Sequence, residues 1–194
     1  MYKLCKTEQS SQRQRQLEQG LLSMMLEKRY EDISVSELCE RLNVPRKAFY
    51  RYFTSKDGAL FALLDHTMLD FYAEGLRGSV GGALGDLESF FLFWYQHRNL
   101  LEALVRSHLG GMIIERATLL AQREKLMPRK ILSWAEDLQG IAMSFAVSGL
   151  MSMVFQWHQQ GYKISPEEIT RVAIAMLTKP LVQGPRSERH TPGD

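Results

Sequence analysis

The sequence predicts an all-α protein with a small three-helix N-terminal domain and a larger helical C-terminal domain. Apolar residues recur at three- and four-residue spacing almost throughout the 194 residues, and little of the chain alternates with period two. Hydrophobic residues make up 45% and charged residues 24%, which is an ordinary globular balance. This length accommodates one small and one larger domain.

Three helices are expected in the N-terminal part. The first covers residues 9–28, with Leu17, Leu21 and Met25 in its apolar stripe. A short helix follows Ser34, which forms a capping box with Glu37. Residues 43–45 (Asn-Val-Pro) form the turn, because Asn tolerates left-handed backbone angles and Pro is preorganised to begin a helix. A third helix then covers residues 45–52.

The C-terminal part is expected to hold longer helices. Thr54 or Ser55 caps a helix over residues 56–76. Residues 75–85 contain five glycines and predict a flexible connection. Helices are expected at 86–97, 99–108, 111–126 and 129–160. Residues 165–168 (Ser-Pro-Glu-Glu) start a last helix to about 178, and residues 180–194, with three prolines, predict a disordered tail.

Residues 34–56 (SVSELCERLNVPRKAFYRYFTSK) have the layout of a helix-turn-helix, in which the start of the second helix meets base edges in the major groove. Arg and Lys there can donate to guanine, and Ala can contact a thymine methyl. The expected base-contacting positions are Pro45, Arg46, Lys47 and Ala48. Tyr50, Tyr52 and Lys56 have polar ends suited to phosphates, whereas Phe49 and Phe53 should pack inward. The alternative is a solvated face of a small helical domain.

The distribution of charge fits this interpretation only mildly. The net charge is +2, too small to indicate nucleic acid by itself. Residues 1–60 carry 11 Lys and Arg against 8 Asp and Glu, while residues 61–178 carry 10 against 12. The N-terminal part is therefore the basic end.

Residues 17–64 resemble the DNA-binding domain of the TetR family of repressors. The matching segments are LLSMMLEKRYEDIS, VSELCERLNV, FYRYF and SKDGALFALL. The resemblance implies that Lys47 contacts bases or backbone, that Tyr50, Tyr52 and Lys56 hold phosphates, and that Ser36 contacts the backbone or a base. Pro45-Arg46-Lys47 departs from the Ser-Lys-Gly or Ser-Arg-Ser of many members, which bears on the bound sequence rather than on the binding mode.

Residues 140–157 lack charged side chains over 18 positions, which reaches the length of a membrane span. Three Ser, two Gly and one Gln favour an interface helix instead. Small residues four apart form a stripe that allows close helix approach; they are Gly140, Ser144, Ser148 and Ser152. Residues 145–177 are similar to the C-terminal domain of a subgroup of the family, whose last two helices form a four-helix dimer interface, so a homodimer on a palindromic operator is expected.

Effector residues are expected among aromatic and Met side chains, although each of them could be plain core. The candidates are Phe91, Trp94, Tyr95, Met112, Phe145 and Met151. The expected effector is apolar or aromatic, and a cationic one fits too because few basic groups lie near these aromatic residues. No His pair has helical metal spacing, Cys5 and Cys39 form neither a zinc motif nor a disulfide framework, and no cofactor is expected.

These observations predict a helix-turn-helix domain over residues 9–56, an effector-binding and dimerisation domain over 57–179, and the tail. The expected function is that of a cytoplasmic, sequence-specific transcriptional repressor released from double-stranded DNA by a small molecule. The alternative is a protein of the same fold that is controlled by a protein partner or organises the chromosome. The sequence contains no phosphate loop or catalytic arrangement that favours an enzyme.

Overall fold

The computed structural model describes residues 1–78, 82–123 and 135–178, and over these ranges it is helical, with one isolated antiparallel bridge between Tyr2 and Phe53. The predicted all-α class is confirmed. The first elements are α1 (Glu8–Glu27), the 3₁₀ turn η1 (Tyr30–Asp32), α2 (Val35–Arg41), α3 (Arg46–Tyr52) and α4 (Lys56–Gly78). The others are α5 (Gly82–Gln96), α6 (Arg98–Arg106), α7 (Gly110–Arg123), α9 (Glu136–Gln159) and α10 (Pro166–Thr178).

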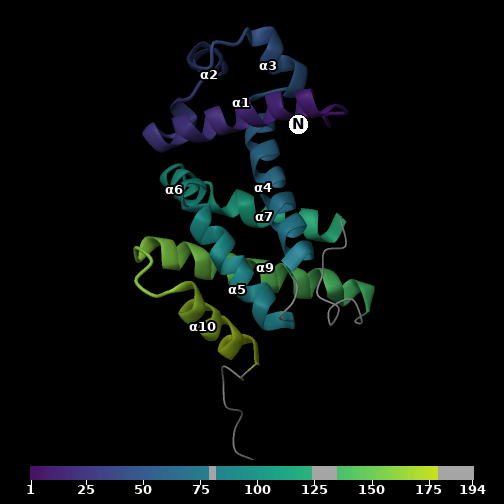
Figure 1. Cartoon of the computed structure of the whole chain (residues 1–194), viewed down its shortest axis with the longest axis vertical. Coiled ribbons are helices and arrows are strands. Elements are labelled where there is room, and N and C mark those ends of the chain that lie inside the picture. Colours follow the sequence, from purple (N-terminus) through teal and green to yellow (C-terminus); the bar gives the residue numbers. More distant parts are fainter. Residues whose placement is uncertain (79–81, 124–134, 179–194) are drawn as a thin grey trace, which may run out of the picture.

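The helices form two ends joined by α4. Figure 1 shows α1, α2 and α3 at one end, α9 and α10 toward the other, and α4 running between them. Because α4 starts just after α3 and packs against both α1 and α7, it is the direct mechanical link from α3 to the rest of the chain.

Local capping determines where several helices start, as the sequence predicts. The Ser34 hydroxyl accepts the Glu37 amide at 3.1 Å. Ser165 and Glu168 cap each other reciprocally, at 2.8 and 3.2 Å. Ser55 rather than Thr54 caps α4, by accepting the Gly58 amide at 3.1 Å.

The turn before α3 also follows the prediction. Asn43 has a φ of 51°, in the left-handed region that Asn tolerates. Pro45 is extended, with ψ at 142°, so it precedes the helix instead of forming its first residue. Its fixed φ of −63° still directs the chain into α3.

Some predicted boundaries were wrong. The glycine-rich run is helical up to Gly78 and again from Gly82, so the expected connection over 75–85 is mostly helix. The helix predicted over 129–160 is observed as α9 from Glu136. Residues 129–134 of that prediction lie outside the described residues, as does the predicted tail.

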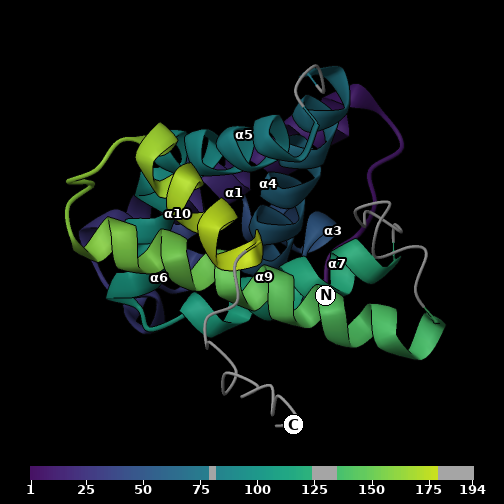
Figure 2. The ribbon, with the colours of Figure 1, turned by 90° about the horizontal axis from the view of Figure 1, so that it is seen from below.

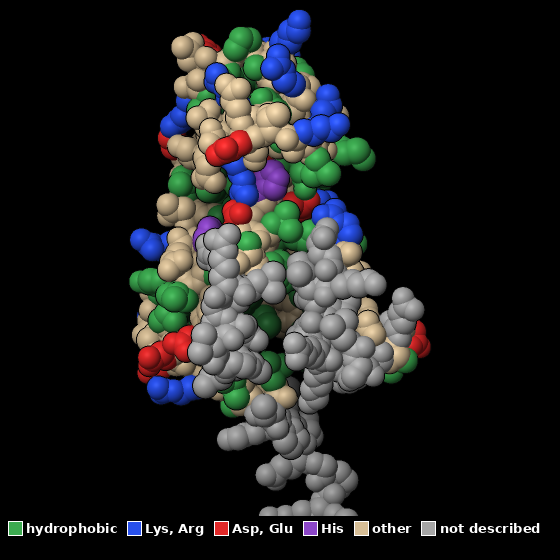
Figure 3. All heavy atoms as spheres, turned by 45° about the vertical axis from the view of Figure 1, so that its right-hand side comes forward, with side chains coloured by type: hydrophobic (Ala, Val, Ile, Leu, Met, Phe, Trp, Pro, Cys, Tyr) green, Lys and Arg blue, Asp and Glu red, His purple; other side chains and the backbone are tan. Residues whose placement is uncertain are grey.

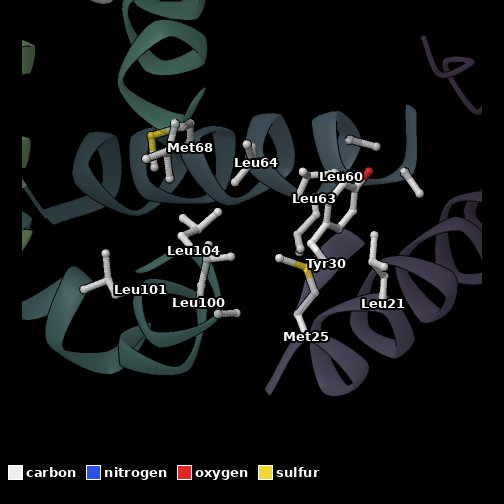
Figure 4. Close-up of a cluster of buried hydrophobic side chains, with 14 of the residues drawn as sticks. Leu21, Met25, Tyr30, Leu60, Leu63, Leu64, Met68, Leu100, Leu101 and Leu104 are labelled. Atoms are coloured by element: carbon white, nitrogen blue, oxygen red, sulfur yellow. The ribbon is translucent and has the colours of Figure 1, made fainter. Parts of the chain in front are cut away.

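The core is continuous across both predicted domains. One cluster of buried side chains extends from Leu17 in α1 to Ala173 in α10. In Figure 4, Leu60, Leu63 and Leu64 of α4 face the side chains of α1 and of α6. Leu21 and Met25 come from α1, and Leu100 and Leu104 from α6, all of them almost fully buried. A shift of α4 therefore affects packing at both ends of the molecule.

The end of the molecule that lies away from α3 exposes apolar surface. Figure 2 views the molecule from this end and shows α9 and α10 in front of α1 and α4. Ile141 and Phe145 of α9 are 69% and 71% exposed. By length and composition α9 could cross a membrane, a test that a core helix of a soluble protein also passes, yet only 17% of its apolar window is buried within this chain.

Candidate nucleic-acid interface and effector region

The second helix of the helix-turn-helix presents a basic face to solvent. Arg46 and Lys47, in the first turn of α3, are exposed, and Tyr50 is 44% exposed. The Arg46 guanidinium carbon lies 6.0 Å from the Tyr50 ring centroid. Pro45 is also exposed and Ala48 is half-buried. The structure therefore leaves all four predicted base-contacting residues at least partly accessible.

The opposite face of α3 anchors the helix to its domain. Phe49 and Phe53 are buried, at 0% and 1% exposure, with ring centroids 5.0 Å apart. Their inward packing was predicted and is confirmed. Because the aromatic side holds α3 in place, the basic side is held in one orientation before any partner binds.

Arg51 is a surface residue that the sequence analysis did not select. It is exposed, and it lies four residues after Lys47, so both side chains share one face of α3. This spacing was visible in the sequence and could have identified it. Figure 3 shows Lys and Arg side chains gathered toward the same end of the molecule.

Tyr52 and Lys56 are placed differently from the prediction. Tyr52 is only 8% exposed and belongs to the core cluster. The Lys56 ammonium donates to the carbonyl oxygens of Tyr30 and Ile33, at 2.6 and 2.7 Å, and lies 4.2 Å from the Tyr30 ring centroid. Desolvation by burial lowers the pKa of Lys56. In this structure Lys56 fastens the η1 turn to the start of α4.

Ser36 lies at the start of α2 and is exposed, whereas Ser34 makes the capping bond. Its hydroxyl therefore stays accessible on the same domain as α3. A groove of about 1220 Å³ separates α1 from the turn and α3, and Gln16, Asn43, Ala48 and Arg51 are among its lining residues. The groove leaves one flank of α3 open to solvent.

An ion pair between buried Asp65 and partly buried Arg116 joins α4 to α7, and the same carboxylate bonds the N-terminal segment. Asp65, 2% exposed, accepts the Arg116 Nε hydrogen at 2.8 Å, a second bond from Arg116 Nη2, and the Tyr2 hydroxyl at 2.8 Å. The bond to Asp65 raises the pKa of Arg116, and burial is the main cause that raises the pKa of Tyr2. Both carboxylate oxygens of Asp65 therefore accept hydrogen bonds.

The predicted effector residues differ in burial, and three of them belong to the core. Phe91, Trp94 and Met151 are almost fully buried, and Tyr95 packs at 5.7 Å from Trp157 and 5.1 Å from Tyr162. Phe145 lies apart from these residues, with its side chain 71% exposed on α9. Met112 is partly buried against the core. Trp157, at 6.2 Å from Phe91, is an aromatic neighbour that the sequence analysis missed because it lies 66 residues further along the chain.

Trp94 carries an unusual polar group. Its indole Nε1 is buried and, within the part of the chain that the structure describes, has no hydrogen-bond partner. By contrast, the Trp157 indole donates to the Ile164 carbonyl at 2.9 Å. An unmet buried donor costs about 1–3 kcal/mol, so this position would gain from an acceptor.

The small-residue stripe of α9 lies only partly on the outward face. Ser144 and Ser152 are exposed, Ser148 is half-buried, and Gly140 is half-buried near Gln122 of α7. The exposed side runs through Leu138, Ile141, Phe145, Gly149 and Ser152 at helical spacing. Among the described residues, no group of three or more His, Cys, Asp and Glu side chains is placed to hold a metal ion.

Comparison with known proteins agrees with this geometry. Residues 22–63 match the family model described as bacterial regulatory proteins, tetR family. A solved structure titled as the fatty acid degradation regulator FadR from Bacillus halodurans is similar, with a TM-score of 0.60 and 14% identity over 90% of this chain and 96% of that one. No curated protein sequence matches. The matched segment covers α2 and α3 and adjoining parts of α1 and α4.

Proposed function

We propose that this chain, whose N-terminal segment belongs to the tetR family of bacterial regulatory proteins, is a homodimeric transcriptional repressor that a small molecule releases from its operator. The observation that carries the proposal is the two-sided α3. Its aromatic side is buried in the domain, while Arg46, Lys47 and Arg51 remain exposed. A helix fixed in this way can read base edges in a major groove.

The residues of this surface would contact either bases or phosphates. Arg46 and Lys47, in the first turn of α3, would donate to guanine O6 and N7, and Ala48 would contact a thymine methyl. Tyr50, Arg51 and Ser36 would hold phosphates and set the register on the duplex.

The DNA-binding part is tested by selecting bound sequences from a random pool and measuring affinity for the selected site. Lys47→Ala should weaken binding by about 1–3 kcal/mol and relax the sequence preference at one position. Lys163→Ala, which removes an exposed Lys from the far end of the molecule, is the control. Unchanged preference in Lys47→Ala would mean that another surface reads the bases.

The homodimer would use the exposed side of α9 together with α10. Ile141 and Phe145 on α9, and Val172 and Met176 on α10, are between 47% and 71% exposed. Exposed apolar surface of this kind is typical of an interaction site. A two-fold axis there pairs like with like and places two α3 helices on one face of a palindrome.

The effector would bind in the α5 region at Trp94 Nε1, which has no hydrogen-bond partner among the described residues. Phe90 and Phe93, whose ring centroids lie 6.4 and 5.7 Å from that of Trp94, would contact an apolar body, while the indole would donate to a carbonyl or carboxylate oxygen. An N–H donor offers nothing to a cation, so an acceptor-bearing ligand fits better than the cationic one. The similar FadR structure is titled as a regulator of fatty acid degradation, and acyl compounds combine these two features.

A thermal-shift screen of acyl and aromatic compounds tests the effector. A compound at one hundred times its dissociation constant stabilises the fold by about 2.7 kcal/mol. Trp94→Phe keeps the ring packing but removes the donor, so it should lose most of this stabilisation. The compound should also lower operator affinity, because coupling requires different affinities in the two states.

Equal operator affinity with and without a bound compound would contradict release. A screen without any stabiliser would favour the alternative function, in which a protein partner controls the DNA-bound dimer or the dimer organises the chromosome.

A further inference from the structure

We propose that the N-terminal arm, residues 1–7, is a second DNA-contacting element that places Lys3 and Lys6 on phosphates beside the end of α3. The inference rests on the proposed DNA-binding function and adds a contact outside the helix-turn-helix. It concerns affinity and salt dependence and leaves the reading of bases to α3.

The arm is docked on the end of α3 by its backbone. The Lys3 amide donates to the carbonyl of Tyr52, the last residue of α3, at 3.0 Å. The Thr54 amide donates to the Met1 carbonyl at 3.1 Å, and Tyr2 forms an antiparallel bridge with Phe53. The arm therefore runs alongside the segment that connects α3 to α4.

Side chains fix the arm at further points. The Tyr2 hydroxyl donates to buried Asp65 at 2.8 Å, and the Gln14 amide donates to the Lys3 carbonyl at 3.2 Å. Cys5 Sγ donates to Gln14 Oε1 at 3.0 Å. Since successive side chains of an extended segment point to opposite sides, Lys3 faces away from the buried Tyr2 contact, and it is exposed.

Gly58 makes room for the arm on α4. A Cβ at this position would lie 2.4 Å from the Met1 carbonyl oxygen, a backbone atom that a side-chain rotation cannot move away. The arm therefore has a defined binding site on α4 at Gly58, which we call its seat.

The arm adds positive charge beside the end of α3. Tyr52 is buried and Lys56 is bonded to the Tyr30 and Ile33 carbonyls, so the two phosphate contacts expected at this end are engaged inside the protein. Lys3 and Lys6 are exposed, and among the described residues neither has an ion-pair partner.

The dimensions allow such a contact. The 7 residues of α3 span roughly 10 Å at about 1.5 Å per residue, and the major groove is about 12 Å wide. With α3 in the groove, a side chain that starts beside Tyr52 lies near the phosphates that border the groove. Contacts of this kind raise affinity for every sequence and weaken with salt.

The test compares full-length wild type with the double variant Lys3→Gln/Lys6→Gln on the selected operator and on an unrelated duplex, across 50 to 200 mM salt. Losing two phosphate contacts should make the slope of log affinity against log salt shallower by about 2, so that affinity falls about tenfold less over this range. Both duplexes should lose affinity alike. Lys163→Gln, which also removes an exposed Lys, is the control.

Gly58→Ala separates the seat from the charges, because it keeps both lysines while its Cβ displaces the arm. It should reproduce the shallower slope, with folding checked by circular dichroism. A slope in the double variant equal to that of wild type, or to that of Lys163→Gln, would overturn the proposal whatever Gly58→Ala does. A wild-type protein that selects no sequence would instead refute the proposed function, and the arm with it.

Discussion

The two ends of this molecule leave opposite chemistry exposed. The α3 end presents Arg46, Lys47 and Arg51, while the α9 end presents Ile141 and Phe145, each about 70% exposed. Each helix also has a side buried in the core: Phe49 on α3, and Val154 and Trp157 on α9. The difference indicates two kinds of partner, a polyanion at one end and an apolar surface at the other.

The ends also differ in how their buried polar groups are satisfied. Toward the α3 end, Asp65 bonds Tyr2 and Arg116, and Lys56 bonds backbone carbonyls. In the α5 region Trp94 Nε1 has no partner among the described residues. The hydrogen bonds around α4 therefore favour a rigid junction, whereas the Trp94 donor in the α5 region lacks an acceptor among the described residues.

The largest expected effect tests that rigidity. Asp65→Ala leaves the Arg116 guanidinium and the Tyr2 hydroxyl without their acceptor, so the free energy of unfolding should fall by about 3–5 kcal/mol. Asp70→Ala is the matched control, because its pair with Arg15 is 34% and 47% exposed and is expected to contribute about 0–1 kcal/mol. Urea unfolding measures the free energy of unfolding of both variants. Equal decreases would mean that the Asp65 pair contributes no more to stability than the exposed pair.

Phe145→Glu tests the apolar end. A charge at this position on both copies should turn a dimer into monomers and weaken operator binding, with a loss of about 2 kcal/mol or more in association. Leu119→Glu, at a residue that is 51% exposed on α7, serves as the control. Sedimentation velocity measures the mass, and a dimer that persists in Phe145→Glu would place the interface elsewhere.

Lys56→Met distinguishes an internal role from a phosphate contact. If Lys56 mainly fastens η1 to α4, the free energy of unfolding should fall by about 1.5–3 kcal/mol, the range for hydrogen bonds to a charged group. The salt dependence of DNA binding should stay as in wild type. Chemical unfolding and binding titrations decide this, since a shallower salt slope without lost stability would restore the phosphate contact predicted from the sequence.

The smallest effect separates two neighbouring serines. Ser34→Ala should cost about 1 kcal/mol of stability through the lost cap of α2, whereas Ser36→Ala should leave the stability unchanged and weaken DNA binding. Thermal unfolding and affinity are measured for both variants. The same loss of stability in both would contradict the assignment of the cap to Ser34 alone.

The sequence by itself determined the elements whose signals are local. Ser34 with Glu37, Asn43 before Pro45, and the spacing of Phe49 and Phe53 act within a few residues, so the helix-turn-helix and its two-sided α3 were predictable. The resemblance of the same segment to the tetR family agrees with the matched family model. Even the missed Arg51 was visible from its spacing to Lys47.

Only the tertiary structure decided which side chains are free to meet a partner. The sequence predicted that Lys56 and Tyr52 contact phosphates, but Lys56 donates to the η1 carbonyl of Tyr30 and Tyr52 is buried in the core. Phe145 looked like pocket lining and lies outside. The arm finds its seat through contacts between residues about fifty positions apart, such as Lys3 with Tyr52, and helical periodicity carries no information about contacts at that separation.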